Sequence, residues 1–333
     1  MGALAASADP CRSVRMLGAL SSPDAPVRGG ATVGGARRQI DEALALGLKG
    51  INLEPGAYPA PLQADDRCLY PIYEYCEERQ LPVVIMAATD LGKTGGTKWR
   101  SYGGHRLWTA PEDAIRTYAP DNFPVQVVKR GNTARFVAPV ETCGIQKEID
   151  ITLGASVEVV HRLRNTSRRQ LALAPWALTV MAPGGTCIVP MPKRGTHPKD
   201  LLPGNLLVPW LYTDMSDRRW TWGQRYILLR QKANSTPQKL GGLIPDGWAA
   251  YALRGQLFVK HFPCVAGANY PDFGCNFETF TNSDMLEVET LGPLTSIKPG
   301  KTVEHIETWQ LFDNVPAPQN DRDVERYVRP KLA

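Results

Sequence analysis

The feature that most constrains the fold is an alternation of apolar and polar residues that begins near residue 98 and continues almost to the C-terminus. Eleven segments show it, without helical stretches between them: 124–129, 134–140, 145–153, 156–164, 171–180, 226–231, 248–253, 256–262, 277–281, 285–291 and 302–312. A period of two is typical of strands with one buried face, and so many strands favour a large antiparallel sandwich. Turn-rich connectors such as KPGK at 298–301 suit hairpins.

Residues 38–87 follow a different pattern. The stretch 38–48 has apolar residues near helical spacing, and residues 51–53 then form a short apolar run. A second helix is predicted over 67–79, because Asp65 and Asp66 suit a helix N-terminus, and 82–86 reads as a buried strand. The order helix, strand, helix, strand predicts a small parallel sheet.

Four segments follow from these patterns. We expect a poorly ordered segment over 1–37, a partial α/β fragment over 38–90, a β-sandwich over 91–314, and a surface tail with one short charged helix over 315–333. The 333 residues, 43% of them hydrophobic, can build one or two domains with a full core.

Composition excludes several classes of protein. The net charge of +5 comes from 38 basic and 33 acidic residues that are scattered, so nucleic acid is not an expected partner. No run of 18 apolar residues exists to span a membrane. Seven cysteines without C-x-x-C spacing suggest free thiols in the cytoplasm, and Asp9, Arg12 and Arg15 interrupt any apolar export signal.

Two motifs in the α/β segment, KGINLEPGAY at 49–58 and DDRCLYPIYEYCEERQLPVVIM at 65–86, resemble the metal-dependent amidohydrolases. That family has (β/α)8 barrels and includes hydrolases and decarboxylases. Met86 stands where such a strand often ends in a metal-binding His, and the family's N-terminal H-x-H is absent. Two β/α units cannot close a barrel, so amidohydrolase chemistry is not expected.

The longer segment, about 91–314, resembles the galactose-mutarotase-like superfamily and an uncharacterised bacterial branch of it. The motifs are GGHRLWTAPE at 103–112, LAPWALTVMAPGG at 173–185, YPDFGCNFETFTN at 270–282 and LEVETLGPLTSIKPGKTVEHIETWQLF at 286–312. The resemblance implies a β-supersandwich that binds a sugar on its concave sheet. The family's first strands are missing before GGHRLW, so the chain resembles a fusion of two incomplete fragments.

Mutarotation needs a base for the anomeric hydroxyl and an acid for the ring oxygen. In the galactose mutarotases the base is a Glu on a late strand and the acid is a His, and the resemblance implies Glu289 as the base. The period of two places Leu286 and Val288 on one face of this strand, and Glu287 and Glu289 on the other. The alternative is that both carboxylates lie on a solvated face.

The segment GGHRLW supplies the best substrate-contact cluster, since two glycines allow a ligand to approach the backbone. Arg106 can donate paired hydrogen bonds to vicinal hydroxyls, Trp108 can stack on a sugar face, and His105 can be the acid. The mutarotases' second motif, a His followed by paired glycines, has no counterpart here. If GGHRLW instead takes the place of the family's Arg-containing motif, His105 is a binding residue only, and a structural His at a turn is a further alternative.

Four further residues are candidate sugar contacts, each with a structural alternative. His161 suits a cross-strand hydrogen bond, and Trp176 suits the core. Asp272 and Glu278 lie among Phe residues, where a carboxylate needs a partner or has a raised proton affinity.

Metal and nucleophilic chemistry are poorly supported by the sequence. His305, Glu307 and Trp309 share one strand face and are expected to form a hydrogen-bonded trio. The five His are spread without an H-x-H or H-x-x-E-H motif, and no G-x-S-x-G occurs, so no metal or cofactor is expected.

The sequence therefore predicts a carbohydrate-binding β-supersandwich with aldose-1-epimerase-like acid/base chemistry on a small sugar. The alternatives are a non-catalytic sugar-binding module, or a fusion whose lost strands leave it inactive. The sequence specifies neither the sugar nor the oligomeric state.

Overall fold

The structure is a computed structural model that describes residues 16–17, 37–38, 40–41, 44–45, 51–53, 70–79, 83–85, 103–119 and 123–332. The chain divides into two compact units. The first comprises Met1–His105 with Pro120–Phe123, and the second comprises Arg106–Ala119 with Pro124–Ala333. The boundary falls inside one strand, β4 (Gly104–Ala110).

The first unit contains a small sheet of three strands. Its elements are β1 (Met16–Leu17), β2 (Ile51–Leu53), α2 (Tyr70–Glu77) and β3 (Val83–Ile85). Strands β2 and β3 pair in parallel with α2 between them in sequence, as predicted, and β1 pairs antiparallel with β2. The hydroxyl of Tyr75 on α2 donates to the carboxylate of Asp41 at 2.6 and 2.7 Å, which ties α2 to the helical residues near 41. None of the described helices is long and apolar enough to cross a membrane.

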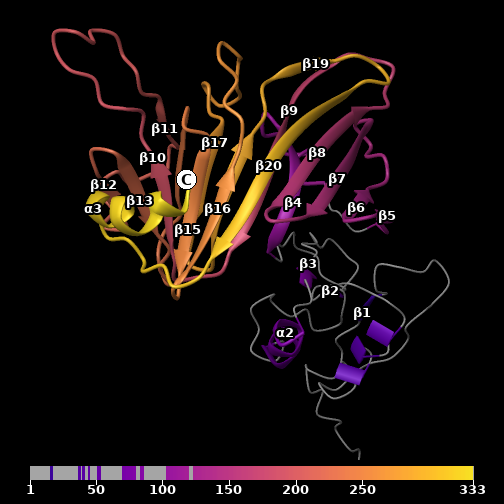
Figure 1. Cartoon of the computed structure of the whole chain (residues 1–333). Coiled ribbons are helices and arrows are strands. Elements are labelled where there is room, and N and C mark those ends of the chain that lie inside the picture. The colour runs from indigo at the N-terminus through magenta and orange to yellow at the C-terminus, as the bar shows by residue number, and fades with distance from the viewer. Residues whose placement is uncertain are drawn as a thin grey trace, which may run out of the picture. The chain divides into compact units, whose positions relative to one another are not determined.

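The second unit is built from two antiparallel sheets (Figure 1). The larger has ten strands in the order β12-β13-β10-β15-β16-β20-β8-β7-β6-β5. In chain order they are β5 (Gln126–Arg130), β6 (Thr133–Val137), β7 (Ile145–Leu153), β8 (Val157–Asn165), β10 (Thr186–Pro190), β12 (Trp220–Trp222), β13 (Tyr226–Arg230), β15 (Trp248–Leu253), β16 (Gln256–His261) and β20 (Thr302–Phe312).

The smaller sheet has seven strands, ordered β11-β14-β17-β18-β9-β19, with β4 also pairing with β9. Their bounds are β9 (Leu171–Met181), β11 (Leu207–Pro209), β14 (Gln238–Gly242), β17 (Phe277–Thr281), β18 (Leu286–Leu291) and β19 (Thr295–Ile297). The predicted mainly β, antiparallel fold class is confirmed, and all eleven predicted strands are present within a few residues of their expected bounds.

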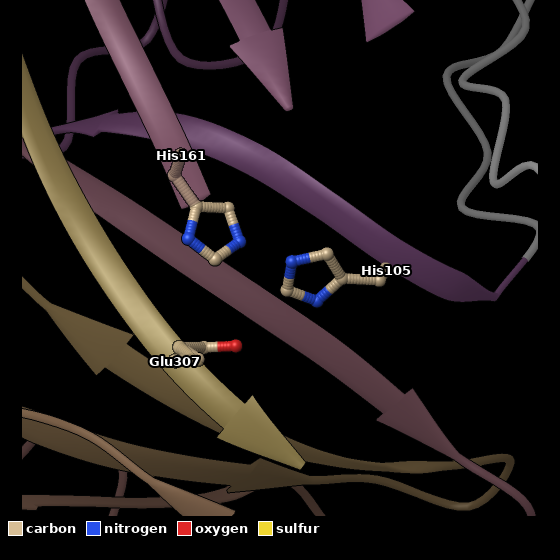
Figure 2. Close-up of side chains that lie close together, drawn as sticks. All are labelled: His105, His161 and Glu307. Atoms are coloured by element: carbon tan, nitrogen blue, oxygen red, sulfur yellow. The ribbon is translucent and has the colours of Figure 1, made fainter. Parts of the chain in front are cut away.

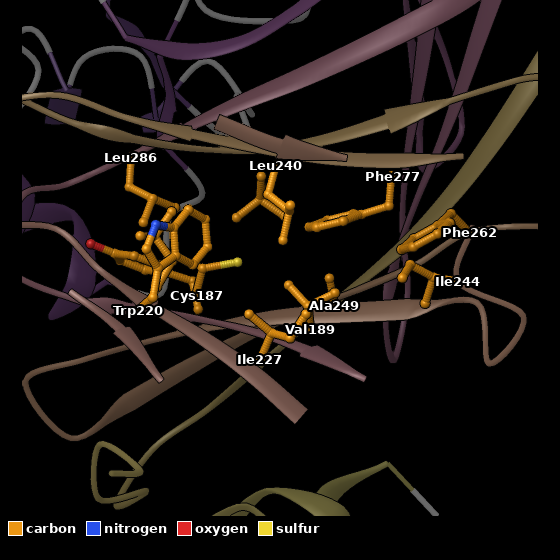
Figure 3. Close-up of a cluster of buried hydrophobic side chains, with 13 residues drawn as sticks. Cys187, Val189, Trp220, Ile227, Leu240, Ile244, Ala249, Phe262, Phe277 and Leu286 are labelled. Carbon is orange, nitrogen blue, oxygen red and sulfur yellow. The ribbon is translucent and has the colours of Figure 1, made fainter. Parts of the chain in front are cut away.

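Apolar side chains from both sheets form the core between them (Figure 3). Val189 and Ile227 of the larger sheet lie opposite Leu240 and Phe277 of the smaller one, and each is at most 3% exposed. Burying an aliphatic or aromatic side chain of this size contributes roughly 1.5–3 kcal/mol relative to exposure. This core therefore fixes which face of each sheet points inward.

Strands β10 and β14 were not predicted, because their sequences do not alternate between apolar and polar residues. Strand β14 reads QKLGG, and its two glycines and two polar residues resemble a turn more than a strand. Strand β10 reads TCIVP, and all five of its residues are buried because both of its faces are covered. A period-two pattern cannot reveal either kind of strand.

The C-terminal residues are packed, although a surface tail was expected. They form a short α-helix, α3 (Asp321–Asp323), a π-helical turn, η3 (Val324–Val328), and a 3-10 turn, η4 (Arg329–Lys331). Asn320 caps α3 by accepting a hydrogen bond from the backbone of Asp323. Val324 and Val328 are fully buried against Leu228 and its neighbours. Ile227 lies in the core between the sheets, so these valines cover the outer face of the larger sheet.

Candidate functional site

A group of charged side chains lies on the face of the smaller sheet that points away from the core. Leu286 and Val288 of β18 enter the core, so Glu287 and Glu289 project from the opposite face, as the alternation predicted. Neither glutamate is solvated, because Glu287 is 5% exposed and Glu289 is 0% exposed. The alternative of a solvated face is therefore wrong.

Three more charged residues complete this group, which we call the charged cluster: Arg106 on β4, Lys239 on β14, Glu278 on β17, and Glu287 and Glu289 on β18. Glu278 and Glu289 are direct cross-strand partners. Every member is at most 6% exposed. Buried charges at such density are stable only when they are paired or when some of them are neutral.

Among the described residues, Glu289 has hydrogen-bond partners at one of its two oxygens. Its Oε2 accepts hydrogen bonds from Trp176 Nε1 at 2.8 Å and from Lys239 Nζ at 3.2 Å. Its Oε1 is buried and makes no hydrogen bond with the described residues. Burial raises the pKa of Glu289, and the Lys239 ammonium opposes that shift. One oxygen thus remains able to accept a proton.

Lys239 bridges the two facing carboxylates. Its Nζ lies 2.7 Å from Glu278 Oε2, besides its bond to Glu289. Burial favours the neutral amine, but Glu289 and Glu278 outweigh it and hold the pKa of Lys239 well above its usual value. The ammonium also lies 4.7 Å from the ring centroid of Trp176 and 4.6 Å from that of Trp210, in cation–π contact. Lys239 is therefore positively charged.

Glu278 is fully buried beside this ammonium. Burial raises the pKa of Glu278 well above its usual value, in spite of Lys239 and with further contributions from Glu289 and Asp272. The sequence had predicted that a carboxylate among these Phe residues needs a partner or has a raised proton affinity, and Glu278 has both. Asp272 lies in the connection before β17, where its carbonyl accepts a hydrogen bond from Cys275 Sγ at 3.1 Å.

Arg106 forms the second ion pair of the charged cluster. Its Nη2 donates to Glu287 Oε1 at 2.7 Å, and its guanidinium lies 4.3 Å from the ring centroid of Trp108. Trp108 meets Trp176 edge-on, with ring centroids 5.4 Å apart and an interplanar angle of 74°. Trp108 also contacts Tyr118, with ring centroids 5.1 Å apart. Aromatic rings therefore border the charged side chains.

Gly241 on β14 makes room for this arrangement. A Cβ at this position would lie 2.6 Å from Cys275 Sγ, 3.2 Å from the ring of Trp210 and 3.3 Å from Glu278 Cγ. Glycine thus allows Trp210 and Glu278 to pack directly on the strand. Sequence reasoning missed Lys239 and Gly241, because strand β14 does not alternate. It also missed Trp210, which directly follows the short strand β11.

His105 lies with a different group. Successive side chains of a strand point to opposite faces, so His105 points away from the side of β4 that carries Arg106 and Trp108. The potential ligand atoms of His105, His161 and Glu307 lie within 4.8 Å of one another (Figure 2).

The position of Glu307 shows on which side this group lies. Glu307 accepts a hydrogen bond from Thr290, whose side chain lies on the face of β18 opposite to Glu289. The charged cluster therefore contains the predicted residues Arg106 and Glu289 but not His105.

The group around Glu307 is a buried hydrogen-bonded network. Glu307 Oε1 lies 3.0 Å from Lys260 Nζ, and Oε2 accepts from Trp309 Nε1 at 2.7 Å. Both oxygens already have donors. Burial lowers the pKa of Lys260, and its contact with Glu307 opposes that shift. Two histidines and a carboxylate are donors that a transition metal prefers, yet this carboxylate is saturated by Lys260, Thr290 and Trp309.

The two histidines of the network face each other across strands. His161 and His305 are cross-strand partners, and His161 Nδ1 lies 2.9 Å from the carbonyl of His305. Since a carbonyl only accepts, Nδ1 carries the proton. Burial lowers the pKa of both rings, that of His305 to about 3, so both are neutral. The cross-strand role expected for His161 is present. Of the expected trio, Trp309 and Glu307 are hydrogen-bonded directly, whereas His305 Nε2 lies 2.7 Å from Thr290 Oγ1, which in turn bonds Glu307.

The described cysteines are free thiols, namely Cys76, Cys143, Cys187, Cys264 and Cys275.

Comparisons with known proteins give low similarities. No family model matches the chain, and no curated protein matches it. Among solved structures, a candidate aldose 1-epimerase from Escherichia coli K12 aligns with a TM-score of 0.41 and 9% identity, covering 68% of this chain and 79% of the other. A galactose mutarotase-like protein from Lactobacillus casei aligns with a TM-score of 0.37 and 11% identity, covering 57% and 74%. No comparison gives evidence for the amidohydrolase fragment or for a fusion.

Proposed function

We propose that the protein binds a small carbohydrate at the charged cluster and interconverts its anomers by acid/base chemistry, with Glu289 as the base. The observation that carries this proposal is the state of Glu289, a fully buried carboxylate with one oxygen that accepts no hydrogen bond from the described residues. The resemblance of 91–314 to the galactose-mutarotase-like superfamily implies the same residue. Small-molecule sites combine aromatic walls with a few convergent polar groups and shifted pKa values, and this face has all three.

Each member of the site has a role in this proposal. Glu289 Oε1 takes the proton of the anomeric hydroxyl, and its raised pKa makes it a stronger base than an exposed glutamate. Arg106 and Lys239 donate hydrogen bonds to sugar hydroxyls, and Trp108 or Trp176 stacks on the apolar face of the ring. Asp272 and His161 lie outside this set, and we propose no direct sugar contact for them.

A sugar reaches the charged cluster only if the bordering side chains move, because its members are at most 6% exposed. Tyr212, next to β11, is the bordering residue that is best placed to move, since it is 49% exposed and its electrostatic partners include Lys239 and Glu289. We propose that Tyr212 and Trp210 rotate away when the ligand enters.

The first experiment is polarimetry of freshly dissolved single anomers of common hexoses, pentoses and uronic acids. The parent protein should speed the approach to anomeric equilibrium for at least one of them. Glu289→Gln should lose at least ~100-fold in rate, since general base catalysis contributes typically ~10²–10⁴-fold. The matched control is Glu158→Gln, an exposed glutamate on β8. A Glu289→Gln variant that is as fast as the parent would contradict the proposal.

A second candidate is a non-catalytic sugar-binding module. The observation that favours it is the placement of His105, which leaves no histidine acid beside Glu289 among the described residues. Isothermal titration with the same sugars separates the two functions. Binding without any rate enhancement favours the module, and binding with Glu289-dependent turnover favours the isomerase.

A further inference from the structure

The charged cluster contains one more carboxylate than it has cations. Arg106 and Lys239 supply two positive charges, and Glu278, Glu287 and Glu289 supply three negative charges when all are ionised. The Arg106–Glu287 pair at 2.7 Å is balanced by itself. One ammonium, Lys239, therefore remains to neutralise two fully buried carboxylates at 2.7 and 3.2 Å.

The other titratable side chains near the cluster do not correct this imbalance. Lys260 also interacts electrostatically with Glu289, but it is paired with Glu307 at 3.0 Å. Tyr118 and Tyr212 stay neutral, because burial raises the pKa of both hydroxyls, that of Tyr212 to about 12. Cys275 stays a thiol, because burial raises its pKa as well. Asp272 adds a negative charge near Glu278 rather than a positive one. An uncompensated buried carboxylate is costly, and a proton removes that cost.

We propose that Glu278 and Glu289 share one proton at neutral pH, that this proton lies on Glu278, and that Glu278 is the general acid that complements the base Glu289. The catalytic part of this inference rests on the proposed function. The shared proton rests only on the contacts and charges of the cluster.

The hydrogen bonds decide which of the two carboxyls is protonated. The Trp176 indole donates to Glu289 at 2.8 Å and so stabilises its ionised form, whereas Glu278 receives no indole hydrogen bond from the described residues. Lys239 is closer to Glu278, which favours the opposite assignment. The negative charge of Asp272 opposes the ionisation of Glu278, and the pKa of Glu278 is raised well above normal in spite of the Lys239 contact.

The two carboxyls also have the geometry for a proton exchange across one ligand. They are direct cross-strand partners, and each has a buried Oε1 without a hydrogen bond to the described residues. During ring opening, Glu289 takes the proton from O1 as C1=O1 forms, the C1–O5 bond breaks, and Glu278 gives its proton to O5. Ring closure on the other face of C1 returns both protons, so the net proton balance is zero.

Infrared spectroscopy of the full chain in D2O at neutral pH tests the shared proton without any sugar. The parent should show the carbonyl stretch of a protonated carboxyl. Glu278→Gln should remove that band. Glu289→Gln should remove it as well. Glu278 is then the single carboxylate beside Lys239, so it can be ionised without an uncompensated charge. Glu158→Gln should retain it. Circular dichroism and thermal melting establish that each variant is folded.

Lys239→Met is a second variant with an opposite expectation. Without the ammonium both carboxyls should be protonated, so the band should increase. A parent without the band, or a band unchanged in both glutamine variants, would overturn the shared proton.

Kinetics then separate this inference from the proposed function. With a sugar that the parent turns over, Glu278→Gln should reduce kcat by at least ~100-fold with a smaller change in KM, and the loss of activity at alkaline pH should disappear. A full kcat in Glu278→Gln would overturn the acid role while Glu289 remained the base. If the parent turns over no sugar, the proposed function and the acid role fail together, and the infrared band still decides the shared proton.

Discussion

At the scale of single residues, the free energy of the charged cluster depends on how many protons it holds. Glu278 has a folded-state pKa raised above its ordinary value of 4.5. At a pH below the ordinary pKa of 4.5, the carboxyl is protonated in the folded and the unfolded chain alike. As the pH rises above it, the unfolded chain releases the proton and the folded chain retains it, so the unfolded state gains stability.

The parent should therefore lose stability with rising pH more steeply than Glu278→Gln. The difference in the free energy of unfolding should change by up to ~1.4 kcal/mol per pH unit, starting near the ordinary pKa. Urea unfolding between about pH 5 and about pH 8 measures it. Parallel curves for the two proteins would mean that Glu278 is ionised in the folded chain.

At the scale of elements, the close packing between β14 and its neighbours depends on a missing side chain. Gly241→Ala places a Cβ 2.6 Å from Cys275 Sγ and 3.2 Å from the ring of Trp210. We expect a loss of roughly 1–3 kcal/mol in the free energy of unfolding, as for other overpacked sites. Denaturant unfolding measures it.

The control for Gly241→Ala is Gly204→Ala, in the connection before β11. Nothing lies within 4 Å of a Cβ at Gly204, so that variant should stay within roughly 0.5 kcal/mol of the parent. Equal losses in the two variants would mean that the backbone freedom of glycine matters here and that the close contact at Gly241 does not.

At the scale of the whole second unit, stability depends on the C-terminal segment as well as on the two sheets. Val324 is 0% exposed against the outer face of the larger sheet. Val324→Ala should lower the free energy of unfolding by about 1–3 kcal/mol, through lost burial and the cavity that remains. Val140→Ala, at a position that is 51% exposed, is the control and should lose far less. If both variants unfold at the same temperature as the parent, the C-terminal segment does not stabilise the second unit.

The predictability of the site differs between its strands. Strand β18 alternates strictly, so its two glutamates were placed on one face from the sequence, and Arg106 was predicted beside them from its motif. Lys239 was missed because QKLGG has no alternation. His105 was expected with Arg106, but adjacent residues of a strand point to opposite faces, and only the strand assignment of 104–110 makes this visible.

The sequence by itself determined the mainly antiparallel β-fold and the faces of its regular strands, because side-chain direction in a strand depends only on a local period of two. The tertiary structure decided which strands are neighbours, and hence that Lys239 stands between Glu278 and Glu289. The tertiary structure also decided that both faces of the smaller sheet are covered. Burial and the proximity of charges arise from residues far apart in the chain, so the protonation of the cluster became apparent only in the folded structure.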